Sequence, residues 1–168
     1  MGTTTIGHQH LGHRVQPYEH VSRFAEVERR VLEQHQDIRA RLRGLAAAVE
    51  RSSTQWTDHP KVALLRLADV FDAHLTFEEQ SLAPCIRELD AWGAVREAAM
   101  QREHVEQRQR LERVCAMADG SVAVRGARLR REISMLVLSL LEDMEKEEAA
   151  LADLLRIDED GSLDQMTG

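Results

Sequence analysis

An internal repeat constrains this chain most strongly, and it appears when the 168-residue sequence is compared with itself at a shift of 69 positions. Histidine, arginine, glutamate and leucine positions then coincide without a gap. The matched pairs are His35/His104, Arg39/Arg108, Leu42/Leu111, Glu78/Glu147, Glu79/Glu148 and Leu82/Leu151. Two matched helical hairpins packed by a pseudo-twofold make an all-α, up-down-up-down four-helix bundle, which is the predicted fold.

Four segments place apolar residues at alternating steps of three and four, the pattern of helices that face a core. Short breaks with Ser, Asp, Gly or Pro separate them. We predict helices over about 18–51, 60–89, 94–118 and 123–156. Pro84 is expected to kink the second helix or end it early.

One domain over residues 18–157 is predicted, because the chain is too short to make two domains the default. The segments 1–17 and 158–168 lack apolar periodicity, so we expect flexible tails, the second of them acidic. The first carries histidines that could bind metal weakly, although a solvated tail is the favoured interpretation.

The net charge of −7, with basic residues mixed among acidic ones, lacks the basic stripe that neutralising phosphates requires. Nucleic acid is therefore not an expected partner. No run approaches the roughly 20 apolar residues that span a bilayer, and residues 1–13 have no apolar core of the signal-peptide kind. We expect a cytoplasmic protein with no membrane partner.

Polar residues interrupt the apolar stripe of every predicted helix near its middle. His74 with Glu78, and Asp143 with Glu147, are four positions apart and therefore share a helix face. His35 and His104 interrupt the other two helices. Buried carboxylates without partners cost several kcal/mol each, a conflict that bound cations remove. The pattern predicts a metal site, for which imidazole and carboxylate ligands favour iron, with manganese or zinc less favoured.

These residues resemble the haemerythrin HHE, or haemerythrin-like, cation-binding domains. That family has one His on the first helix, His-x-x-x-Glu on the second, one His on the third and His-x-x-x-Glu on the fourth. The second-helix motif here, HLTFEEQSLAP over residues 74–84, matches closely. The resemblance implies two iron ions with an oxo or hydroxo bridge. By the same resemblance, Glu78 and Glu147 bridge the irons, and the terminal ligands are His35, His74 and His104.

Asp143 departs from the family pattern, because it stands where the fourth-helix His is expected. We predict it as a sixth ligand, either direct or through water. A one-residue shift that uses Glu148 beside Met144 is the alternative, although the repeat register of Leu151 argues against it. The added negative charge should favour the ferric state, lower the reduction potential and reduce reversible oxygen carriage.

Several neighbouring side chains are candidates to shape the site. Phe71, Phe77 and Met144 lie within a turn of predicted ligands and could wall a pocket, with ordinary core packing as the alternative. Gln107 takes the inward place of Ile38 in the repeat and could hydrogen-bond a ligand. The remaining candidates, Glu79 and Glu148, are expected to be solvated or to orient the ligand imidazoles.

An open metal position would make the site reactive toward a small molecule. The expected function is to bind, sense or reduce O2, NO or peroxide. Whether the site turns over as an enzyme is left open by the sequence. Two alternatives stay open: metal storage or buffering without turnover, and an interaction module that metal holds together.

Overall fold

The computed structural model describes residues 17–52, 58–119 and 126–164, and every element within these ranges is helical. The elements are α1 (Pro17–Arg51), α2 (Asp58–Phe77), the π-helical segment η1 (Glu78–Leu82), α3 (Ala83–Leu89), α4 (Gly93–Ala118) and α5 (Gly126–Asp164). Since α2, η1 and α3 follow one another without a break, the described chain forms four long helices. The predicted tail over residues 1–17 lies almost entirely outside the described residues.

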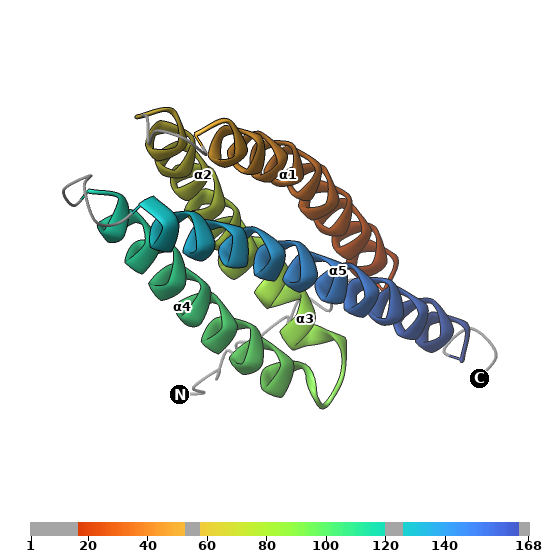
Figure 1. Cartoon of the computed structure of the whole chain (residues 1–168). Helices are drawn as coiled ribbons and strands as arrows, with labels where there is room; N and C mark the ends of the chain where they lie inside the picture. Colours follow the sequence, from red (N-terminus) through yellow and green to blue (C-terminus); the bar gives the residue numbers. More distant parts are fainter. Residues whose placement is uncertain (1–16, 53–57, 120–125, 165–168) are drawn as a thin grey trace, which may run out of the picture.

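The helices pack side by side along much of their length (Figure 1). Helix α5 packs between α1 and α4, and α2 contacts the same two helices from its own side. All four long helices contribute to one shared apolar cluster. The interior therefore lies among the four long helices.

Two apolar clusters fill the interior, and a polar layer separates them. On α1, Ile38 belongs to one cluster and Val31 to the other, with His35 between them. On α5, Met144 and Leu151 are divided in the same way, with Glu147 between them. Buried apolar surface on both sides thus holds the histidine and glutamate layer in place.

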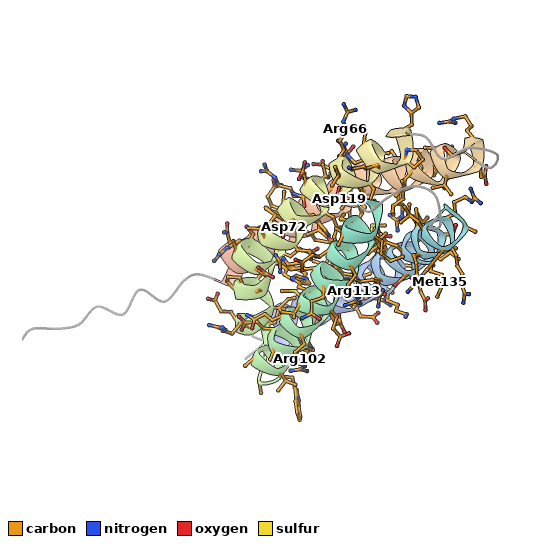
Figure 2. The ribbon with its side chains drawn as sticks, turned by 60° about the vertical axis from the view of Figure 1, so that its left-hand side comes forward. Arg66, Asp72, Arg102, Arg113, Asp119 and Met135 are labelled. Carbon is orange, nitrogen blue, oxygen red and sulfur yellow. The ribbon has the colours of Figure 1, made fainter. Side chains whose placement is uncertain are left out.

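Charged side chains cover the outside of the molecule. Arg66, Arg102 and Arg113 extend outward from their helices in Figure 2. The described helices include none with a segment long and apolar enough to cross a membrane.

Most helix boundaries agree with the sequence predictions to within three residues, but the last helix does not. Helix α5 continues to Asp164, into the segment 158–168 that was expected to be a tail. Asp158, Glu159 and Asp160 give no apolar periodicity there. Their backbone can nevertheless continue a helix that packing has already nucleated, since adding a residue costs much less than starting a turn.

The second helix continues through Pro84. The alternative prediction, that the helix ends early there, is wrong. Its winding changes to π over Glu78–Leu82 and returns to α over Ala83–Leu89, with Pro84 in the first turn of α3. Proline lacks an N–H and clashes with the carbonyl four residues before it in an α-helix. The wider turn relieves that conflict, and it starts at Glu78, a predicted metal ligand.

The turn between α3 and α4 requires glycine at position 93. A Cβ atom there would lie 2.3 Å from the carbonyl oxygen of Ile86, far inside van der Waals contact. The Asp90 carboxylate accepts the Trp92 N–H at 2.8 Å and stabilises the turn. This close approach keeps α3 and α4 together beside the polar layer.

Candidate metal centre

Four buried or largely buried side chains converge between the two apolar clusters. One donor atom from each of His35, His74, Glu78 and Glu147 lies within 4.8 Å of the others. They come from α1, α2, η1 and α5. His104 joins the group from α4 through its contact with Glu78. Every long helix therefore contributes at least one side chain.

Glu78 is the centre of this group and is completely buried. Its Oε1 lies 3.1 Å from Nε2 of His74 and 4.0 Å from Nε2 of His35. Its Oε2 lies 3.0 Å from Nε2 of His104. Glu147 reaches the same place, with Oε2 3.5 Å from Nε2 of His35. The two oxygens of Glu78 thus face different histidines, the arrangement that a carboxylate bridging two ions needs.

The outward nitrogen of each imidazole is held by an acceptor. Nδ1 of His35 lies 2.8 Å from Glu148, and Nδ1 of His104 lies 3.0 Å from Glu79. Nδ1 of His74 lies 2.9 Å from the amide oxygen of Gln34. A proton on Nδ1 satisfies each acceptor and leaves Nε2 with a lone pair directed inward, the tautomer that metal-ligating histidines use.

Two arginines support these acceptors in the same way in both halves of the repeat. Arg39 donates to both oxygens of Glu148, at 2.6 and 3.0 Å, and Arg108 to both oxygens of Glu79, at 2.5 and 3.2 Å. These hydrogen bonds are the main reason why the pKa values of Glu148 and Glu79 are lowered. The two carboxylates are therefore ionised and keep the Nδ1 protons.

The inward donor atoms lack hydrogen-bond partners among the described residues. The atoms concerned are Nε2 of His35, both oxygens of Glu78 and Oε1 of Glu147. Histidine lone pairs and carboxylate oxygens repel one another at these distances unless a cation or proton lies between them. The cluster is thus chemically incomplete as a set of protein groups alone.

Electrostatics in the cluster favour a neutral imidazole at His74. Burial, together with the neighbouring His35, lowers the pKa of His74 to about 3, which leaves its imidazole neutral. Burial and the nearby Glu147 carboxylate raise the pKa of Glu78. Two carboxylates in direct apposition without a cation cannot both ionise easily.

The structure brings five of the six predicted ligands together but does not bring in Asp143. This side chain is 31% exposed, and its Oδ2 lies 3.5 Å from both Gln107 Nε2 and Ser139 Oγ. Arg110 Nη1 is 3.8 Å away. These polar partners hold the short Asp side chain outside the group. Met144 is buried in the larger apolar cluster and Glu148 lies outside the inner group, so helix α5 is not shifted by one residue.

The predicted pocket walls have different positions from one another. Phe71 packs near the centre, with its ring centroid 5.9 Å from that of His74. Phe77 packs in the other apolar cluster, where Arg30 lies 5.7 Å above its ring. Gln107 donates to Asp143, the residue predicted as the sixth ligand.

Sequence reasoning gave no role to three features of the site. Arg39 and Arg108 coincide in the repeat, each four positions after a histidine, so a signal for them existed. Gln34 carries no such signal, because Glu103 occupies its place in the second half. In the sequence, only Pro84 indicates the π-turn that begins at Glu78.

Comparison with known proteins adds no relative. This chain matches no protein-family model, no curated protein and no solved structure. The function of this chain is therefore inferred from its own geometry.

Proposed function

We propose that this chain is a haemerythrin-like metalloprotein that holds two iron ions and binds, senses or reduces a small oxidant. The observation that carries the proposal is Glu78. It is completely buried, has no hydrogen-bond partner at either oxygen within the described ranges, and faces three imidazole nitrogens at 3.0 to 4.0 Å. Cations at this place would satisfy every one of these atoms at once.

The donor set favours two ions rather than one. His35 and His74 lie on the Oε1 side of Glu78, whereas His104 lies on the Oε2 side. Glu147 adds a second carboxylate, one oxygen of which has no partner in the part of the chain that the structure describes. Nitrogen and carboxylate ligands suit iron, and also accept manganese or zinc, on the basis of ligand type.

The fold that fits this site is an up-down-up-down bundle of two hairpins related by a pseudo-twofold. Under that arrangement, His35 with its Glu148 and Arg39 is the counterpart of His104 with its Glu79 and Arg108. Equal support of the two imidazoles is what the 69-residue repeat would produce. This is the basis on which we infer the bundle topology.

Bound iron would supply redox chemistry and an open position for O2, NO or peroxide. The residues of the chain would hold the histidines neutral, present their Nε2 lone pairs and keep bulk water away from Glu78. Metal storage and metal-dependent folding are the rival functions. Neither rival function predicts that a small molecule bound to the metal changes the absorption spectrum of the centre.

Metal analysis of the full chain, purified without added metal, tests the proposal. We expect about two iron ions per chain and absorption bands that change with azide, peroxide or NO. Glu78→Gln should abolish tight binding, whereas Glu50→Gln, an equal charge change on the exposed face of α1, should not. A colourless protein with zinc would contradict the redox function, and a metal content unchanged by Glu78→Gln would contradict the site.

A further inference from the structure

A pocket of about 440 Å³ opens between α3, α4 and α5 and reaches the candidate metal centre. Two of its lining residues, His104 and Glu147, belong to the centre itself. Consistent with this opening, the Glu147 side chain is 27% exposed, whereas that of Glu78 is completely buried. The α4 and α5 side is therefore the accessible side of the centre.

The pocket exists where the two halves of the repeat differ. Ile38 is completely buried in the first hairpin, and its counterpart in the second is Gln107, which lines the pocket. His74 points into the cluster, and its counterpart Asp143 lines the pocket instead. The second half of the repeat has less apolar volume at these positions and one ligand fewer, which leaves space beside Glu147 and His104.

The volume of this pocket exceeds the needs of a diatomic molecule. One water molecule takes roughly 30 Å³ of the liquid, whereas pockets for small organic ligands occupy roughly 300 to 1,000 Å³. A volume of 440 Å³ lies in the second range. Apolar side chains also form a large part of the wall: Leu82, Ile86, Met100, Leu151 and Leu154. An organic body would bury apolar surface against them.

The polar end of the pocket is suited to a ligand that donates a hydrogen bond. Nε2 of Gln107 donates to Asp143, which fixes the amide orientation and leaves Oε1 as an acceptor. This Oε1 atom is buried and has no partner among the described residues. The atom is closed to solvent as the side chain stands, so the Gln107 amide turns toward the pocket when a ligand hydroxyl satisfies it.

Charges around the pocket disfavour an anionic ligand. Its cationic side chains already lie against acidic or hydroxyl groups: Arg96 against Asp90 at 2.7 Å, Lys146 against Glu142 at 2.7 Å, and Arg110 against Ser139 and Asp143. Four carboxylates also line it, those of Glu103, Glu106, Asp143 and Glu147. In the metal-free chain, another negative charge would meet repulsion here.

We infer that this pocket binds a small neutral organic molecule with an apolar body and a hydroxyl group, an alcohol, a phenol or an organic hydroperoxide. The body packs on Met100 and Leu151, and the hydroxyl donates to Gln107 beside His104 and Glu147. The inference rests on the proposed function, because it names the ligand class admitted to the same centre.

Nuclear magnetic resonance of the full chain tests the inference without turnover. The protein carries ¹³C-methyl methionine and is titrated both without metal and with redox-inert zinc, and Met100→Leu assigns the Met100 signal. Phenol, cumyl alcohol and cumene hydroperoxide should shift that signal saturably. Phenol should bind about tenfold more tightly than benzene, which has the same ring without a donor. Equal affinity for benzene, tighter binding of benzoate to the metal-free chain, or no shift with any hydroxyl compound would overturn the inference.

Matched variants locate the binding place. Ala99→Phe fills the pocket and should abolish the phenol shift, whereas Ala98→Phe places the same ring on the exposed face of α4 and should bind phenol like the unmodified chain. Gln107→Met should lower phenol affinity to that of benzene. If Ala99→Phe still binds phenol, the pocket assignment is wrong.

The zinc titration separates the two proposals. Failure to bind zinc at the cluster, with phenol binding intact, would contradict the metal function and leave the pocket as a ligand site. Zinc binding at two ions per chain, with no phenol shift, would contradict the pocket alone. Comparison of cumyl alcohol with cumene hydroperoxide, which share one body, tells which hydroxyl class binds more tightly.

Discussion

In both hairpins one histidine is held in the same way, by a glutamate and an arginine, but the side chains next to that histidine differ. In the first, His74 points to Glu78 and Ile38 is completely buried. In the second, Asp143 turns to Gln107 and the space beside Glu147 stays open. The repeat therefore preserves the imidazole supports, and its differences confine access to one side of the centre.

The largest effect should come from exchanging the residues that distinguish the hairpins. His74→Asp should lower zinc affinity by more than about 100-fold, beyond the loss expected for an outer partner, because it removes a donor 3.1 Å from Glu78. Asp143→Ala should change the affinity by less than about threefold, since Asp143 lies outside the group. Competition with a chelator measures both constants. Equal losses would mean that Asp143 ligates, directly or through water.

The shared feature of the hairpins predicts equal effects of smaller size. Arg39→Ala and Arg108→Ala should each weaken zinc binding by about tenfold, because each frees a glutamate that orients an imidazole. Arg43→Ala, on the exposed face of α1, is the matched control and should have no effect. Isothermal titration calorimetry gives the values. A large loss in only one of the two variants would show that the supports are not equivalent.

The apolar difference between the hairpins can be tested by stability. Gln107→Ile copies Ile38 into the second half and removes a buried amide oxygen that no described residue partners. The free energy of unfolding of the metal-free chain should rise by about 1 kcal/mol. Urea denaturation measures it, with Gln109→Ile on the exposed face of α4 as control. A decrease for Gln107→Ile alone would mean that the pocket side cannot accept a branched apolar side chain.

The smallest expected effect is on the reduction potential of the proposed iron centre. Asp143→His removes a negative charge near the centre and should raise the potential, because anionic groups favour the ferric state. The carboxylate is partly exposed, so solvent screens it and the rise should stay below about 59 mV, the tenfold step of a one-electron couple. Redox titration followed by absorption measures the change. An unchanged or lower potential would refute the charge argument.

Sequence reasoning located the residues that backbone periodicity alone determines. His35, His74, Glu78, His104 and Glu147 lie on inward helix faces, and a helix register fixes the direction of each Cα–Cβ bond. Long and buried side chains at such positions have few other places to point. Their meeting in the structure follows from spacing and from the repeat.

Other features depend on choices that spacing does not determine. Asp143 has the expected register, but its side-chain direction depends on Gln107, Ser139 and Arg110. The π-turn results from competition between Pro84 and packing on both sides, which no periodicity encodes. Rotamers and local winding are set by tertiary contacts, and these become visible only in the folded chain.

The crossed imidazole supports have a consequence for how the fold opens. His35 on α1 is held by Glu148 on α5, and His104 on α4 is held by Glu79 on η1, so each hairpin holds a histidine of the other. His35 and His104 are therefore oriented only across the two hairpins, whereas Gln34 holds His74 within the first. An ion that binds only the assembled pair adds its binding free energy to the docking of the hairpins. Hydrogen exchange should therefore slow on metal addition most where α1 meets α5 and where η1 meets α4, which makes the ion a clamp between two halves.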